Sequence, residues 1–146
     1  MGKEKIIIDT NCLISAFGWN GNERVLLRKV ISGEYLLVVS EEQFQELERV
    51  LSYPKLKFSE QKQKKIIDIV KSISLVVKKN RTNSEKMLLL RDPDDNFLLE
   101  CADASNADYI ITGDKGVLEL KQYGKTKILT TRELLEEKLR NQQKNS

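Results

Sequence analysis

The stretch Ile6-Ile7-Ile8-Asp9 decides the fold class of this chain. Three consecutive β-branched residues favour a strand that is buried on both faces, as strands of parallel sheets are. The apolar run ends at Asp9, so we expect its carboxylate at the carboxyl end of the strand. Parallel sheets bind ligands beyond these ends, which makes Asp9 the first candidate site residue.

Further strands and helices alternate along the rest of the sequence. Apolar runs predict strands at 36–39, 75–77, 109–111 and 127–129. Capping signals predict helices that begin near Asn22, Ser40, Ser59, Asp92 and Thr130. We therefore predict an α/β fold with a parallel sheet and right-handed crossovers.

The same pattern bounds the predicted elements. The first helix should carry Val25, Leu26, Val30 and Ile31, and the terminal helix should have Leu134, Leu135 and Leu139 inside. We expect one domain over residues 1–140, followed by a polar tail at 141–146. A length of 146 residues is typical of a single domain.

Composition excludes several classes of function. The chain has no His, which rules out Ser-His and Cys-His dyads and imidazole metal ligands from this chain. Cys12 and Cys101 have no zinc-knuckle spacing and are expected as buried, reduced thiols. With neither a signal peptide nor a membrane-length apolar run, we expect a cytoplasmic protein with no membrane contact.

Chemistry must then rest on carboxylates. Asp114 ends a second predicted strand, as Asp9 does, and both should face the same crevice. Asp95 falls in the middle of a helix face that also carries Leu98, Leu99 and Ala102. On the helix after Ser40, Glu46 and Glu48 lie at opposite edges of the apolar arc, and helical spacing does not choose between them.

Such acids repel one another when they gather. Each close pair costs roughly 4 kcal/mol at an effective dielectric near 20, which a divalent cation relieves. An all-oxygen set suits Mg²⁺ or Mn²⁺ and hydrolysis of a phosphodiester by a metal-bound water. Each acid also has a structural explanation, because Asp92, Asp94, Asp95 and Asp114 could cap helices and Glu46 could be a solvated helix residue.

Four segments together resemble the motifs of PIN-domain ribonucleases, in the same order. They are Ile6-Ile7-Ile8-Asp9-Thr10-Asn11, Val39-Ser40 followed by Glu46-Leu47 and Val50-Leu51, Asp92-Pro93-Asp94-Asp95-Asn96, and Ile111-Thr112-Gly113-Asp114. The likeness covers nearly the whole chain and is nearest to compact VapC-like toxins of toxin-antitoxin systems.

The resemblance implies a three-layer α/β/α sandwich around a parallel sheet of about five strands. It also implies Mg²⁺- or Mn²⁺-dependent cleavage of single-stranded RNA, a cognate antitoxin and a possible homodimer. Asp9, Glu46 and Asp95 match the principal acids of the family, and Asp114 matches the fourth. Asp9 and Asp95 would hold the metal, with Glu46 and Asp114 completing the shell. The accessory polar positions are matched by Asn11, Thr112 and Asp92.

Two other functions are compatible with parts of the pattern. A catalytically silent PIN-like module could bind RNA or a protein, but all four matched positions are acidic here. A haloacid-type phosphatase or phosphotransfer module needs a second acid near the first, where this chain has Asn11. The phosphatase or phosphotransfer hypothesis is therefore the least favoured of the three.

Two surface features remain open at the sequence level. Trp19 could contact a partner or a stacked base, or could pack back onto the helices. A group of basic residues could guide RNA phosphates, although a solvated face is the commoner role of such residues. This group comprises Lys55, Lys57, Lys62, Lys64, Lys65, Lys78, Lys79 and Arg81.

Overall fold

A mixed sheet forms the middle layer of the protein. The computed structural model describes residues 2–78 and 96–144, to which the following account is confined. The strands are β1 (Glu4–Ile8), β2 (Tyr35–Ser40), β3 (Ser74–Val77), β4 (Tyr109–Ile111), β5 (Gln122–Tyr123) and β6 (Thr126–Leu129). Their order across the sheet is β3-β2-β1-β4-β6-β5.

Five of these strands are parallel, as the sequence pattern predicts. β1 is central and pairs with β2 on one side and β4 on the other, with Ile8 opposite Ile111. β5 is antiparallel to β6 and was not predicted, because two residues between turns carry no periodic signal.

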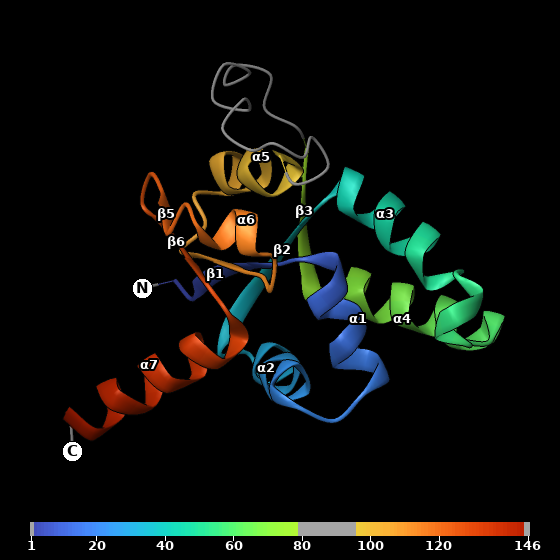
Figure 1. The fold of residues 1–146 in the computed structure, drawn as a ribbon, viewed down its shortest axis with the longest axis horizontal. Helices are drawn as coiled ribbons and strands as arrows, with labels where there is room; N and C mark the ends of the chain where they lie inside the picture. The colour runs from blue at the N-terminus through green and yellow to red at the C-terminus, as the bar shows by residue number, and fades with distance from the viewer. Residues whose placement is uncertain (1, 79–95, 145–146) are drawn as a thin grey trace.

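Helices cover both faces of the sheet (Figure 1). They are α1 (Thr10–Gly18), α2 (Asn22–Ile31), α3 (Glu41–Leu51), α4 (Glu60–Ile73), α5 (Asn96–Ser105), α6 (Lys115–Leu118) and α7 (Thr131–Lys144), with a 3₁₀ turn at Pro54–Leu56. Figure 1 shows α5 and α6 on one side and α1, α2, α4 and α7 on the other. The predicted three-layer α/β/α architecture is confirmed.

The alternation of side chains along β1 divides the core in two. Ile6 and Ile8 belong to the cluster under α1, α2, α3, α4 and α7, whereas Ile7 belongs to the cluster under α5 and α6. All three are buried. Burial on both faces is the reason that the strand is a continuous apolar run.

Most of the predicted helix starts are formed by the expected caps. The hydroxyls of Ser40 and Ser59 accept hydrogen bonds from the backbone N–H groups of Gln43 and Lys62. Thr130 and Glu133 form a reciprocal capping box, because each side chain accepts from the other residue's N–H.

Several local predictions were wrong. α2 is capped by Gly21 without a side-chain hydrogen bond, so Asn22 is its first residue rather than its cap. α1 was not predicted. α7 continues to Lys144, so the terminal helix extends into the segment 141–146 that was expected to be a polar tail.

One side chain predicted to lie inside, Leu139, is exposed instead. Of the apolar residues that α2 carries, Leu26 and Val30 are buried, whereas Val25 and Ile31 are exposed. Within the described ranges, no helix combines the length and apolarity that crossing a membrane requires.

Candidate active site

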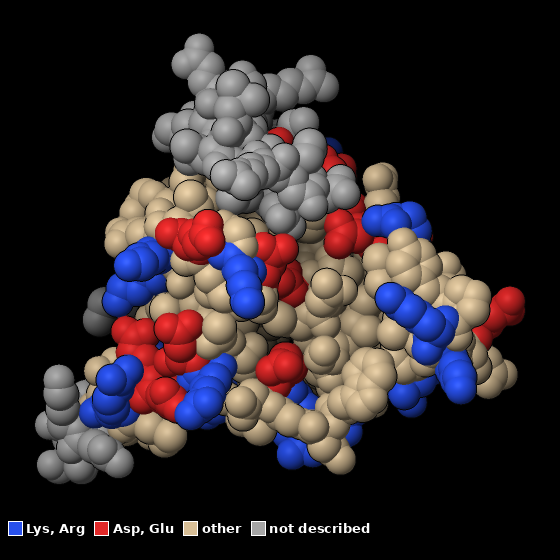
Figure 2. All heavy atoms as spheres, viewed as in Figure 1, with Lys and Arg blue, Asp and Glu red and all other residues tan. Residues whose placement is uncertain are grey.

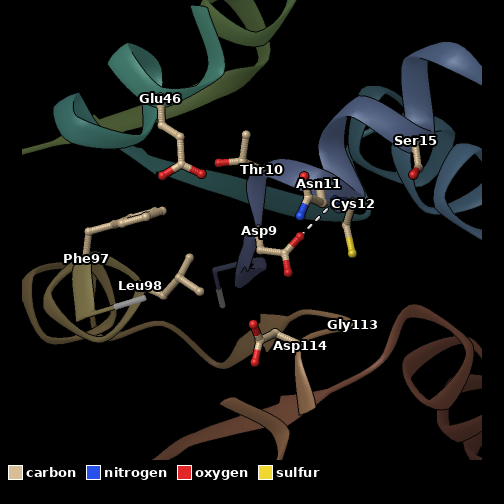
Figure 3. A pocket seen from close by; sticks show the side chains of 10 residues that line it. All are labelled: Asp9, Thr10, Asn11, Cys12, Ser15, Glu46, Phe97, Leu98, Gly113 and Asp114. Carbon is tan, nitrogen blue, oxygen red and sulfur yellow. Dashed lines mark hydrogen bonds between the residues drawn. The ribbon is translucent and has the colours of Figure 1, made fainter. Parts of the chain in front are cut away.

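A cavity of about 340 Å³ lies at the carboxyl ends of the central strands. Four parts of the fold meet there: the β1–α1 junction, α3, the start of α5 and the loop after β4 (Figure 3). The lining residues are Asp9, Thr10, Asn11, Cys12, Ser15, Glu46, Phe97, Leu98, Gly113 and Asp114. The cavity thus occupies the position where parallel sheets bind ligands.

Asp9 is held at the junction between β1 and α1. Its backbone N–H donates to the carbonyl of Ile111, 2.9 Å away, which extends the pairing of β1 with β4 by one residue. Its Oδ1 caps α1 by accepting from the N–H of Cys12 at 2.8 Å, and its Oδ2 accepts from the hydroxyl of Thr112. The carboxylate therefore has a defined orientation.

Asp114 reaches the cavity from the loop after β4. Its Oδ1 caps α6 by accepting from the N–H groups of Gly116 at 2.8 Å and Val117 at 3.3 Å. Its own N–H donates to Oγ1 of Thr112 at 3.0 Å. The structural and functional explanations of this residue are compatible, because the same carboxylate caps a helix and lines the cavity.

Thr112 connects these two acids. Its hydroxyl donates to Asp9 and accepts from the Asp114 backbone, and the residue is 1% exposed. The side chain does not line the cavity itself. Its hydrogen bonds hold Asp9 and the Asp114 backbone, which belong to residues that do line it.

The geometry brings Glu46 rather than Glu48 to the cavity. Glu46 is half-buried on α3 and points towards the space between Thr10 and Asp9 in Figure 3. Glu48 is exposed and borders a separate groove, between α3 and α4, with Glu60 and Lys64. Helical spacing alone had left this choice open.

Two predicted site residues, Asp92 and Asp95, lie outside the described residues. The helix face on which Asp95 was placed is buried as predicted, with Leu98, Leu99 and Ala102 all in the core. Phe97 and Leu98 of the same helix line the cavity. Asn11, the remaining accessory residue, also lines it.

Sequence reasoning missed the contribution of α1 and of Gln43. Thr10, Cys12 and Ser15 line the cavity from α1, a helix that was not predicted from the sequence. Gln43 is fully buried and its Nε2 donates to the carbonyl of Ile8 at 2.6 Å, directly before Asp9. The start of the Ser40 helix signalled a capping box, not this long-range contact.

The cavity offers oxygen ligands and one neutral thiol. Burial raises the pKa of the Cys12 thiol well above its usual range, with the negative charge of Asp9 as the next cause, so the sulfur stays protonated. The Thr10 hydroxyl is buried at the cavity and has no hydrogen-bond partner among the described residues. Neither Lys nor Arg is among the described residues that line the cavity.

This donor set fits a hard divalent cation such as Mg²⁺ or Mn²⁺, which prefers carboxylate and hydroxyl oxygens. Within residues 2–78 and 96–144, no three Asp, Glu or Cys side chains are close enough to form a metal cluster by themselves. The acids that the structure describes therefore do not form a complete metal site by themselves.

Comparisons with known proteins agree with this geometry. Residues 5–116 match a family model described as PIN domain, a range that contains Asp9, Glu46 and Asp114. A search of curated proteins finds no match.

Among solved structures, the chain is similar to a chain in the crystal structure of VapBC2 from Rickettsia felis bound to a DNA fragment from their promoter. The TM-score is 0.58 at 18% identity, with 85% of this chain and 96% of that chain covered. At this identity the likeness establishes a shared fold.

Proposed function

The chain belongs to the PIN-domain family, and from this premise we propose that it is a metal-dependent endoribonuclease that hydrolyses phosphodiester bonds of single-stranded RNA. One observation carries the proposal. Asp9, Glu46 and Asp114 come from three distant parts of the sequence and line one cavity at the carboxyl end of the sheet.

The matched residues have distinct roles in this proposal. Asp9, together with Asp95, would hold Mg²⁺ or Mn²⁺, and Glu46 and Asp114 would complete the set of oxygen ligands. Thr112 fixes the carboxylate of Asp9, and Asn11 and Asp92 are positioning residues. When bound, the ion activates a water for attack on phosphorus and offsets the charge of the phosphate.

The acidic lining favours hydrolysis over RNA binding without cleavage. Carboxylates repel a phosphodiester unless a cation intervenes, so a cavity lined by acids is a poor binding site for RNA alone. A silent PIN-like module would have no need of three acids at one point. Binding of RNA without metal and without cleavage would instead support the silent module.

The fold also supports a partner. The similar structure is a VapBC2 complex, and we propose that this chain is likewise the toxin of a toxin-antitoxin pair. An antitoxin would act by covering the acidic cavity. Homodimerisation and a cytoplasmic location stay predictions from the sequence.

Cleavage of single-stranded RNA in the presence of Mn²⁺ or Mg²⁺ tests the activity. We expect cleavage by the parent, none with EDTA, and a loss of about 100-fold or more in Asp9→Asn and Asp95→Asn. Circular dichroism should show that the variants are folded. Equal cleavage by the parent and a folded double variant would contradict the proposal.

A matched pair of substitutions on α3 tests the geometry of the site. Glu46→Gln should lower activity because it removes a charge that lines the cavity, whereas Glu48→Gln should leave it unchanged because Glu48 faces the groove beside α4. Both substitutions keep size and helix propensity nearly constant. The reverse result would place the cleavage site elsewhere on the protein.

A further inference from the structure

Trp19 presents an exposed aromatic surface close to the candidate active site. It is the only tryptophan of the chain and follows directly after α1. Its side chain contacts Phe58, with ring centroids 6.1 Å apart and the planes inclined by 51°. The residue nevertheless remains 53% exposed. Trp19 thus packs against one neighbour and also faces solvent.

The surroundings hold this aromatic pair in place. Gly18 allows the Phe58 ring to approach closely, since a Cβ at that position would lie 3.0 Å from Cζ of the ring. The guanidinium of Arg24 donates to the carbonyls of Ala16 and Phe17 and to the side chain of Asn20, which fixes the loop that carries Trp19. The pair is therefore a supported platform.

Positive charge surrounds the platform. Nζ of Lys62 lies 4.8 Å from the centroid of the Phe58 ring. A neighbouring groove of about 440 Å³ runs between Phe17 and α4, and Lys62 and Lys65 line it. Residues 55–71 contain six Lys and two acidic residues, an excess greater than the net charge of +3 of the whole chain.

Basic and acidic side chains gather in different places on this part of the surface. Figure 2 shows Lys and Arg side chains over the region of α3 and α4, while acidic side chains surround the hollow in the middle of the view. Surfaces that bind single-stranded nucleic acids combine exposed aromatic rings with positive charge. Each base has a face that can stack on a ring, and each phosphate linkage carries a negative charge that Lys attracts.

α1 connects the platform to the cavity. Ser15 lines the cavity, and its carbonyl accepts from the N–H of Trp19 at 3.0 Å. Four residues of helix correspond to a rise of about 6 Å. A strand with its scissile linkage in the cavity can therefore extend along α1 to reach Trp19.

We propose that Trp19, supported by Phe58 and Lys62, is a stacking platform for a base of single-stranded RNA that flanks the scissile linkage. The inference rests on the proposed function only in taking that RNA to be the strand that is cut. The excess of Lys favours RNA over a neutral or basic protein segment as the occupant.

Intrinsic fluorescence tests the contact directly, because Trp19 is the only indole of the chain. Titration of the Asp9→Asn variant, which is expected not to cleave, with a short single-stranded RNA of mixed sequence in the presence of Mn²⁺ should quench the emission. A duplex of the same length should quench it less, because its bases are already stacked. Unchanged emission at an RNA concentration that saturates binding by anisotropy would overturn the inference.

Substitutions separate stacking from charge. Trp19→Ala should weaken RNA binding by about 5- to 150-fold, with the loss falling on KM more than on kcat, and Trp19→Phe should restore most of the affinity. Lys62→Gln should reduce the slope of log affinity against log salt by about 0.7. Leu139→Ala removes an exposed apolar side chain from α7 and should change nothing.

The outcomes distinguish this inference from the proposed function. Metal-dependent cleavage with the same KM in Trp19→Ala and the parent would overturn the platform and leave the nuclease intact, with a protein partner as the remaining occupant of Trp19. Quenching of Trp19 by RNA, together with weaker RNA binding by Trp19→Ala as measured by anisotropy, in a protein that cuts no RNA would support the platform and contradict the nuclease.

Discussion

At the scale of single residues, Thr112 joins the two halves of the candidate site. One hydroxyl contacts both Asp9 and the Asp114 backbone, and these residues follow neighbouring strands. The sequence placed Thr112 at an accessory position but gave no reason for a hydroxyl there. The reason is geometric, since a group that donates to one acid and accepts from the other must be both donor and acceptor.

Thr112→Val should therefore lower activity without unfolding the protein. The substitution keeps the β-branched shape and leaves the Asp9 carboxylate and the Asp114 N–H without their shared partner. We expect a loss of about 10- to 100-fold in metal affinity or activity. The measurement is cleavage rate against Mn²⁺ concentration, with Thr112→Ser as the control that keeps the hydroxyl. Parent-like metal dependence in the valine variant would contradict this role.

At the scale of elements, α7 shows how far an apolar pattern can be read from sequence. Its capping box forms as predicted. Leu134 is 0% exposed, whereas Leu139 is 59% exposed and had been predicted to lie inside. The helix contacts α2 and β6 near its start and continues past them to Lys144. The end of a helix can thus extend beyond the core that stabilises its beginning.

Two alanine substitutions on α7 should differ sharply in their effect on stability. Leu134→Ala creates a cavity in the core and should lower the free energy of unfolding by about 2–5 kcal/mol. Leu139→Ala should change it by less than about 0.5 kcal/mol, because the side chain is already in solvent. Urea denaturation measures both. A large loss in the second variant would show that Leu139 is covered in solution.

At the scale of the whole molecule, the strand order places the site. β1 connects through α1 and α2 to β2 on one side, and its other neighbour, β4, is reached only much later in the chain. The crevice opens at this reversal of direction, between the ends of β1 and β4. Asp9 and Asp114 follow these two strands, so the strand order alone brings them to the same edge of the sheet.

The buried thiol and phenol of the two core clusters predict a loss of stability at alkaline pH. Burial raises the pKa of Cys101 from 9.0 to about 12 and that of Tyr35 from 10.0 to about 12. Above pH 9 the unfolded chain loses protons that the folded protein keeps, so the unfolded state is favoured as pH rises. The contribution of these two protonated groups to the free energy of unfolding is complete below pH 9 and is lost between about pH 9 and 12.

Urea denaturation at several pH values between about 8 and 11 measures this loss. Cys101→Ala should be less stable at neutral pH, because it leaves a small void, but its stability should fall less steeply above pH 9. The two proteins are compared by the slope of the free energy of unfolding against pH, not by the free energy at any one pH. Equal slopes in the variant and the parent would contradict a raised pKa for Cys101.

The sequence by itself determined the five parallel strands, most helix starts and the acids at strand ends. Hydrophobic period and capping are local properties, and an acid that closes a buried parallel strand has its position set by that strand. Helical spacing left Glu46 and Glu48 equivalent and the family resemblance favoured Glu46, but only the tertiary structure shows that Glu46 lines the cavity while Glu48 borders a separate groove. It also decided that Trp19 meets Phe58 and stays exposed, since that contact joins residues far apart in the chain.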